Sequence, residues 1–389
     1  MISPFNQQMV SEARVMVVGC GALGNEVVKH LALLEVGLLV LVDFDRVEQD
    51  NLSRSVWFTS DDAQAGRFKV EAMAERIRQL HPSMKVLPIC GDVAYDVGLG
   101  LIRTMDVVIG CVDNRWARYC INRLCMRAGV PWVNGGIDGL EGTARVFVPG
   151  VNCYACNLGP EGLKDMARRQ PCAGVIRRNV EAGKAPTTSI VASIIGAIEV
   201  QEALKLIQDS RSKFHVSSFK CQDEEFTSLC GKMFYYEGQH LTTKLVDFQA
   251  WDEDCPVHER WEPIQQTVLT AETTVSSALQ QLQMELQAQE ITICLTDDCF
   301  VDYVLRRDND SRHEVMLPGR AVASFVEQDK ELCGIPFSGL YQHEWREITA
   351  SFPYQHLTLS ALGVPRQAVL QVQTERGECF VELNDKYEK

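Results

Sequence analysis

The chain has 389 residues, of which 46% are apolar, and a formal net charge of −14 at pH 7. This length allows two or three domains with a large core, and the acidic balance argues against a nucleic-acid binder. The 15 cysteines are odd in number and follow no apolar leader, which favours reduced thiols, metal ligands or a nucleophile over disulfides. No apolar run approaches the roughly 18 residues that span a bilayer, so we expect a cytoplasmic protein without membrane contact.

The first predicted unit is a strand, a glycine turn and a helix. Residues 15–18 are apolar and fit a buried parallel strand, and a G-x-G-x-x-G turn leads into a helix over about 25–34. Such a turn lets a phosphate approach the main chain at the positive end of a helix. The same fingerprint serves NAD and FAD enzymes. The predicted nucleotide-binding residues of the turn are Gly19, Gly21, Ala22 and Gly24.

A second strand over residues 38–42 ends in Asp43, which is 19 residues after Gly24. A carboxylate at this place usually binds ribose hydroxyls. The charged loop that follows contains Asp45, Asn51 and Arg54, and Lys69 begins the next predicted helix. A nicotinamide enzyme does not need these polar groups at the phosphate end of its pocket, whereas an enzyme that attacks a nucleoside triphosphate does.

The order D-x-D-x-V-x-x-x-N-L-x-R in residues 43–54, followed by G-x-x-K in residues 66–69, resembles the ubiquitin-activating (E1-like) superfamily of ThiF/MoeB/HesA adenylyltransferases. The resemblance implies an α/β, Rossmann-like doubly wound adenylation domain that uses ATP and Mg²⁺ and forms a homodimer. Family members usually begin with an Arg-rich helix that reaches the partner's ATP site. Residues 1–12 contain no arginine, so the source of a trans-acting arginine is open.

The α/β alternation continues with a helix over 69–80, strands over 85–90 and 105–111, and a helix over 115–128. Asp113 falls between the second of these strands and the last helix, at a sheet edge where ligands bind. One interpretation is a helix N-cap, worth about 1 kcal/mol. The other comes from the resemblance, because C-x-D-N matches the family's magnesium-binding Asp.

Two further strands, over 131–134 and 142–148, precede the pair Cys153 and Cys156. Such a C-x-x-C pair serves either redox chemistry or half of a zinc site. A C-x-x-H pair, Cys255 and His258, follows about a hundred residues later and would complete a tetrahedral structural zinc site. The family usually has C-x-x-C here, and an ordinary surface histidine is the alternative.

Residues 157–187 are polar and basic, which predicts a crossover loop, and Cys172 lies within it. In relatives that form a thioester, the cysteine precedes a helix like the one expected over 190–208. The resemblance therefore implies Cys172 as the nucleophile, although relatives that only adenylate also keep a cysteine here. A polar insertion over 209–231 and a pair of strands over 232–251 complete an adenylation domain that we expect over residues 1–262.

The remaining residues, 263–389, are expected to form a smaller α+β domain. A helix is predicted over 275–287, with strands over 290–295 and 379–383. The L-x-x-L-G pattern at 359–363 and the following strand resemble the end of a ubiquitin-like β-grasp fold. Activating enzymes use such a domain to recruit a conjugating enzyme, and a generic interaction domain is the alternative.

These features together predict ATP-dependent adenylation of the C-terminus of a ubiquitin-like protein, then thioester formation and transfer to a conjugating-type enzyme. Arg54 and Lys69 would neutralise phosphate charge, Asp113 would hold magnesium, and Cys172 would accept the acyl group. The alternatives are a sulfur-carrier adenylyltransferase of the thiamine or molybdopterin type, a non-catalytic Rossmann partner subunit, and an NAD-dependent oxidoreductase.

Overall fold

The computed structural model describes residues 6–159, 161–162, 188–212, 228–248, 251–296, 298–306, 312–321 and 339–387. Its largest sheet has eight strands in the order β3-β2-β1-β4-β5-β6-β7-β8. The first five are parallel and the last three are antiparallel. Their bounds are β1 Arg14–Val18, β2 Leu38–Val42, β3 Lys85–Ile89, β4 Val107–Gly110, β5 Trp132–Asp138, β6 Glu141–Phe147, β7 Lys232–Glu237 and β8 Thr242–Asp247.

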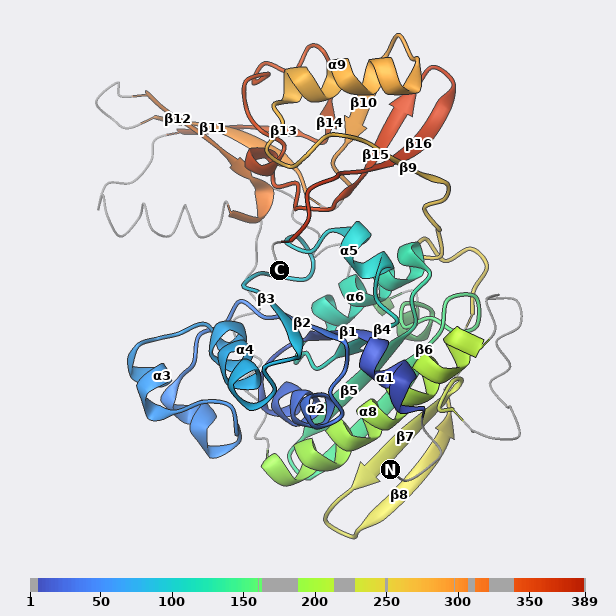
Figure 1. Ribbon diagram of the computed structural model, residues 1–389. Helices are drawn as coiled ribbons and strands as arrows, with labels where there is room; N and C mark the ends of the chain where they lie inside the picture. Colours follow the sequence, from blue (N-terminus) through green and yellow to red (C-terminus); the bar gives the residue numbers. More distant parts are fainter. Residues whose placement is uncertain are drawn as a thin grey trace.

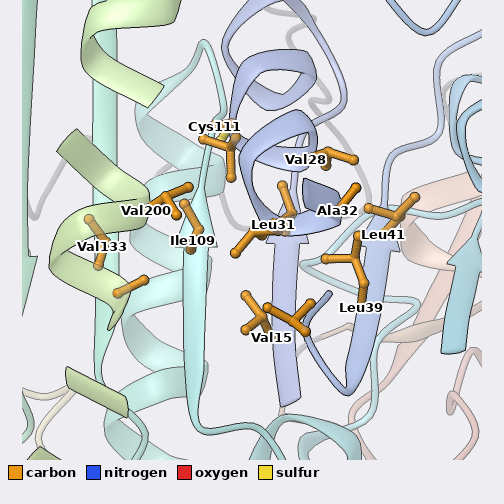
Figure 2. Close-up of a cluster of buried hydrophobic side chains, with 14 of the residues drawn as sticks. Val15, Val28, Leu31, Ala32, Leu39, Leu41, Ile109, Cys111, Val133 and Val200 are labelled. Atoms are coloured by element: carbon orange, nitrogen blue, oxygen red, sulfur yellow. The ribbon is translucent and has the colours of Figure 1, made fainter. Parts of the chain in front are cut away.

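Helices cover both faces of this sheet (Figure 1). On one face α2 and α4 pack against alternate residues of β1 and β2, such as Val15 and Leu39, and α8 packs against β4, β5 and β6 (Figure 2). On the other face α5 and α6 pack against the intervening residues, such as Met16 and Val40. This alternation is the period of two that a strand buried on both sides requires. The helices are α1 Gln7–Glu12, α2 Ala22–Leu33, α3 Ser60–Gln64, α4 Lys69–Leu80, α5 Leu99–Arg103, α6 Arg115–Ala128 and α8 Ser189–Ser212.

The doubly wound α/β architecture confirms the predicted fold class. The bounds of β2, α4 and α6 agree with the prediction residue for residue. In contrast, α8 continues to Ser212, four residues into the segment predicted as an irregular insertion, because no Gly or Pro interrupts it and polarity alone does not end a helix. Residues 213–227 of that insertion and residues 163–187 of the predicted crossover loop lie outside the described residues.

The C-terminal part contains a five-stranded sheet in the order β14-β10-β15-β16-β9, with α9 over one face, and a three-stranded sheet in the order β12-β11-β13 (Figure 1). In the larger sheet β9 and β16 are parallel neighbours. The three-stranded sheet is absent from the sequence prediction. The bounds are β9 Ile264–Gln266, α9 Val275–Leu286, β10 Ile291–Cys294, β11 Phe300–Arg306, β12 Arg312–Pro318, β13 Gly339–Trp345, β14 Glu347–Ile348, β15 Val369–Thr374 and β16 Gly377–Glu382.

The C-terminal part packs directly on the α5 side of the first sheet. The ring of Trp261 stacks on that of Phe380 with centroids 4.8 Å apart, and the amide of Gly100 donates to the carbonyl of Gln367 at 2.9 Å. One apolar cluster therefore contains residues from both parts. The predicted boundary near residue 262 and the ubiquitin-like character of the C-terminal part stay predictions. None of the helices in the described part of the chain has the length and apolar character that a bilayer crossing requires.

Candidate nucleotide site and metal centre

The three glycines of the first turn differ in what surrounds them. Gly19 has φ +93°, and a Cβ there would lie 2.5 Å from the carbonyl oxygen of Cys111. A Cβ on Gly24 would lie 1.9 Å from the carbonyl oxygen of Gly19. A Cβ on Gly21, in contrast, would meet no atom within 4 Å. Gly19 and Gly24 are therefore required by packing, whereas the space at Gly21 is open to a ligand that approaches the main chain.

The helix behind the turn is suited to an anion. Gly21 is the N-cap of α2 and offers no side-chain cap, and the first turn contains no acidic residue. The first backbone N–H groups thus carry the positive end of the helix dipole toward the open space.

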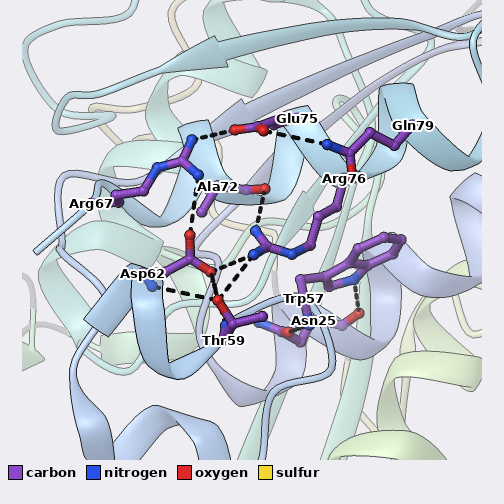
Figure 3. A network of polar contacts seen from close by, with 9 residues as sticks. All are labelled: Asn25, Trp57, Thr59, Asp62, Arg67, Ala72, Glu75, Arg76 and Gln79. Atoms are coloured by element: carbon purple, nitrogen blue, oxygen red, sulfur yellow. Dashed lines mark hydrogen bonds and ion pairs between the residues drawn. The ribbon is translucent and has the colours of Figure 1, made fainter. Parts of the chain in front are cut away.

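Asn25 holds this turn in place, and sequence reasoning gave it no role. Its Nδ2 donates to the carbonyl oxygens of Cys20 and Gly21, both at 3.0 Å. Its Oδ1 accepts from the backbone N–H of Trp57 at 3.2 Å (Figure 3). The only sequence signal was a polar residue directly after the third glycine, where the helix face is buried.

Asp43 follows β2 and lies beside the turn. Its Oδ2 accepts from the amide of Cys20 at 2.6 Å, and its Oδ1 accepts from the amide of Asp45 at 2.7 Å. Burial raises the pKa of Asp43 above its ordinary value, although Lys69 and these hydrogen bonds oppose the effect. The two backbone contacts fix the carboxylate at the position where a ribose would lie.

Lys69 begins α4 and points back to the same loop. Its ammonium lies 2.6 Å from Oδ2 of Asp45, and its amide donates to the carbonyl oxygen of Asp45 at 3.0 Å. The lysine side chain is buried, whereas that of Asp45 is more than half exposed. A buried ammonium whose ion-pair partner among the described residues is one solvated carboxylate can exchange that partner for a phosphate.

Asn51 and Arg54 lie at the 3-10 helix η1 (Gln49–Ser53). Asn51 is buried, and its Oδ1 accepts from the amide of Glu48 at 2.9 Å, which closes a capping box. Arg54 is half-buried at the end of η1, and its guanidinium has no ion pair among the residues that the structure describes. A guanidinium at this place is suited to contact the phosphates of a ligand.

A network of charges between α3 and α4 supports the start of α4, and the sequence prediction did not include it (Figure 3). The carboxylate of Asp62 is buried and contacts Arg67 at 3.1 Å and Arg76 at 2.6 Å. Burial alone would raise the pKa of Asp62, but hydrogen bonds from Thr59 and the charge of Arg76 lower it below its ordinary value. The signal in the sequence was the capping box at Thr59 and Asp62.

Asp113 is exposed at the end of β4, and it is not the helix cap. The N-cap of α6 is Asn114, whose Oδ1 accepts from the amide of Ala117 at 2.8 Å. The N-cap alternative for Asp113 is therefore wrong, because the helix begins one residue later than that interpretation required. Among the hydrogen bonds of the described residues, the carboxylate of Asp113 accepts only one, from the side-chain Nδ2 of Asn114 at 3.2 Å.

Glu199 of α8 is a further buried acid near this edge. It is fully buried, its Oε2 lies 4.0 Å from Sγ of Cys111, and its Oε1 has no hydrogen-bond partner among the described residues. A Cβ on Gly135 would lie 2.4 Å from the carboxyl group, so the strand approaches it closely. Burial raises the pKa of Glu199 well above its ordinary value. The apolar pattern of the helix gave no sign of a buried acid at this position.

The two predicted ligand pairs meet in one cluster. The ligand atoms of Cys153, Cys156, Cys255 and His258 all lie within 4.8 Å of one another. Sγ of Cys156 is 3.3 Å from Nε2 of His258, and the ring of His258 stacks on Trp251 with centroids 3.6 Å apart. The tertiary structure thus brings together segments about a hundred residues apart, and half-buried His258 lies among the three cysteines, so its role as a ligand stays a prediction.

This donor set fits zinc. Four N and S ligands without a fifth position are typical of a closed structural site, with Zn–S distances of about 2.3 Å. Burial raises the pKa of Cys255 to about 11, which disfavours its thiolate. A bound metal would stabilise that thiolate instead. The predicted nucleophile, Cys172, lies outside the described residues.

Comparison with known proteins agrees with this geometry. The ThiF family matches residues 1–257. SAMP-activating enzyme E1 of Haloferax volcanii is 32% identical over 256 residues, which cover 66% of this chain and 84% of that enzyme. Adenylyltransferase and sulfurtransferase MOCS3 of Sus scrofa is 32% identical over 201 residues, 51% of this chain, and the chain spans only 41% of that protein.

A crystal structure of E. coli MccB with succinimide has the same fold, with a TM-score of 0.50 and 21% identity over 65% of this chain and 68% of that one. Two thirds of the chain match the family, and the glycine turn, the acidic loop and Lys69 meet at one sheet edge as the motif set implies. The chain therefore belongs to the ThiF family, as one of its ATP-dependent adenylyltransferases.

Proposed function

We propose that this enzyme activates the C-terminal carboxylate of a small ubiquitin-like or sulfur-carrier protein by adenylation. The observation that carries the proposal is the open space at Gly21 in front of α2, with Asp43 beside it and Lys69 of α4 paired with Asp45 of the loop after Asp43. The names of the relatives, one an activating enzyme for SAMP and one an adenylyltransferase, support this class of reaction.

In the proposed reaction, an oxygen of the substrate carboxylate forms a bond to the α-phosphorus of ATP, and the bond from that phosphorus to the pyrophosphate oxygen breaks. Asp43 would accept hydrogen bonds from the ribose hydroxyls. Asn51, Arg54 and Lys69 would donate to the phosphates as negative charge moves onto the leaving pyrophosphate. Lys69 would exchange Asp45 for phosphate, because the triphosphate carries more charge than one solvated carboxylate.

Asp113 would hold magnesium at the triphosphate, and the ion would neutralise charge on the phosphates. Its carboxylate is suited to this role, because it is exposed and the helix cap is supplied by Asn114. Hard oxygen ligands and retained water are what Mg²⁺ prefers.

The protein substrate would dock on the hairpin of β7 and β8. The edge strand β8 is exposed along its whole length, and Leu241 and Leu245 are 79% and 61% exposed. Leu140, 50% exposed, lies beside the hairpin turn, where its carbonyl accepts from Gly238 at 2.9 Å. Exposed leucines gathered at an open sheet edge are typical of an interaction surface.

A structural zinc ion would be held by Cys153, Cys156, Cys255 and His258. It would tie the segment after β6 to the segment before β9, because each supplies one pair of ligands. The homodimer predicted from the family resemblance is proposed as well, and a scattering mass equal to one chain would contradict it.

The fate of the adenylate divides two versions of this proposal. In the first, the thiol of Cys172 attacks the acyl carbon, AMP leaves, and the resulting thioester passes to a conjugating-type enzyme. In the second, a sulfide-level sulfur nucleophile attacks the acyl carbon, AMP leaves, and the carrier ends in a thiocarboxylate. The name of the pig relative, which includes sulfurtransferase, favours the second version.

The test is ATP–pyrophosphate exchange with a panel of purified ubiquitin-like and sulfur-carrier proteins. We expect exchange to require a free C-terminal carboxylate, so each protein is compared with its C-terminally amidated form. Exchange that is equal with the amidated form would refute adenylation of that carboxylate. A covalent complex that thiols cleave, and that Cys172→Ala loses, would support the thioester version. Its absence together with thiocarboxylate formation from added sulfide would support the sulfur-carrier version.

A further inference from the structure

Asn122 is a fully buried polar residue in the middle of α6, and its side chain makes three hydrogen bonds to residues that the structure describes. Its Nδ2 donates to Sγ of Cys153 at 3.2 Å. Its Oδ1 accepts from the amide of Tyr154 at 3.0 Å and from Nε1 of Trp132 at 3.3 Å. Burying a side-chain amide without hydrogen-bond partners costs several kcal/mol, and these three contacts offset that cost for Asn122.

The orientation of this amide is determined by its surroundings. Tyr154 and Trp132 each present an N–H group, which can only donate. If the amide were rotated by a half turn, its NH₂ group would face both donors and its oxygen would face the sulfur of Cys153. The NH₂ group must therefore point at Cys153, and a thiolate is a better acceptor for it than a thiol because the acceptor is charged.

We infer that Asn122 is a positioning residue for the zinc centre, an inference that rests on the metal site proposed above. It would hold the thiolate of Cys153 in its ligand geometry by an N–H···S hydrogen bond. Contacts of this type outside the ligand shell typically contribute 10- to 100-fold in metal affinity.

The same residue connects the metal centre to the nucleotide side of the molecule. Asn122 and the capping residue Asn114 lie on one helix, and Asp113 directly precedes that helix. Trp132 at the start of β5 is joined to the same amide.

A purely structural role for Asn122 would have a different signature. It would lower the free energy of unfolding and leave the affinity for the metal unchanged. The matched control is Cys125→Ala, because Cys125 is also fully buried on α6, one turn further on. That change perturbs the packing of the same helix without touching the four ligands.

The experiment measures zinc dissociation from the full chain against a chromogenic chelator, for Asn122→Leu, Asn122→Asp and Cys125→Ala. Asn122→Asp keeps the acceptor oxygen and the volume, so it serves where Asn122→Leu does not fold. We expect zinc to bind 10- to 100-fold more weakly in both Asn122 variants than in Cys125→Ala. In the Co²⁺-substituted protein, the sulfur-to-cobalt charge-transfer band should shift in the Asn122 variants only.

The outcomes separate this inference from the proposal on which it rests. Wild-type protein that binds no zinc would refute the metal centre itself. Wild-type protein that binds zinc, with Asn122 variants as tight as Cys125→Ala and an unshifted cobalt band, would overturn the role of Asn122 alone.

Discussion

The glycine turn permits a test in which two similar substitutions have opposite expected results. Gly21→Ala places a methyl group where no atom lies within 4 Å, at a φ of −75° that alanine adopts readily. We therefore expect the fold to be kept, with the free energy of unfolding changed by less than about 1 kcal/mol, because alanine restricts the unfolded chain but is a poorer N-cap than glycine. Gly24→Ala places the same methyl 1.9 Å from a carbonyl oxygen and should destabilise the fold by about 3 kcal/mol.

For ATP binding, Gly21→Ala is the informative substitution and Gly24→Ala is the control. The methyl group of Gly21→Ala fills the space through which a phosphate would reach the first amides of α2. Losing that contact should cost about 2 kcal/mol, the upper value for a partly buried charge at a helix end, which is roughly a thirtyfold rise in the Kd for ATP.

Urea unfolding gives the stability, and equilibrium binding together with pyrophosphate exchange gives the affinity for ATP. A Gly21→Ala protein that is as stable as the wild type and binds ATP equally well would refute the assignment of the open space to the phosphates. A Gly21→Ala protein that unfolds would refute the geometry of the turn itself. Gly24→Ala serves as the control for a general disturbance of the turn.

Three further predictions follow from particular residues. Asp113→Ala should reduce pyrophosphate exchange about a hundredfold, since metal-assisted charge stabilisation is worth several kcal/mol. The urea midpoint should stay unchanged because Asn114 supplies the helix cap. Unchanged exchange would contradict the magnesium role. Removal of residues 263–389 uncovers Trp261, which is 2% exposed and stacks on Phe380. The free energy of unfolding of the shortened chain, measured in urea, should therefore fall by at least about 2 kcal/mol. Equal stability would show that the two parts are independent. Burial raises the pKa of Glu199 in the folded state, so its contribution to the free energy of unfolding is complete below the unfolded pKa of about 4.3. Above that pH the contribution falls by about 1.4 kcal/mol per pH unit until the folded pKa is reached. Glu199→Gln should therefore equal the wild type in stability near pH 4 and exceed it at pH 7, and a difference that does not vary with pH would contradict a buried neutral carboxyl.

The local elements of the first sheet could be read from the sequence because each one carries its own signal. An apolar run of five residues predicts β2, and the apolar positions from Val70 to Ile77 predict α4. The G-x-G-x-x-G turn and the acidic loop likewise placed Gly21, Asp43 and Lys69 at a sheet edge, since parallel strands end on the same side. Spacing also gave both halves of the metal cluster, although each half alone was ambiguous.

Tertiary structure decided what depends on contacts between distant segments. It joined Cys156 to His258 across about a hundred residues, and it gave the cap of α6 to Asn114, so that Asp113 stays available. Neither Asn122 nor Glu199 has a local motif, because a buried polar side chain is defined by the partners that surround it and those partners come from other elements. The contact of Trp261 with Phe380 is of the same kind: it adds residues of the C-terminal part to a buried cluster of the first sheet, and no local signal in the sequence indicated it.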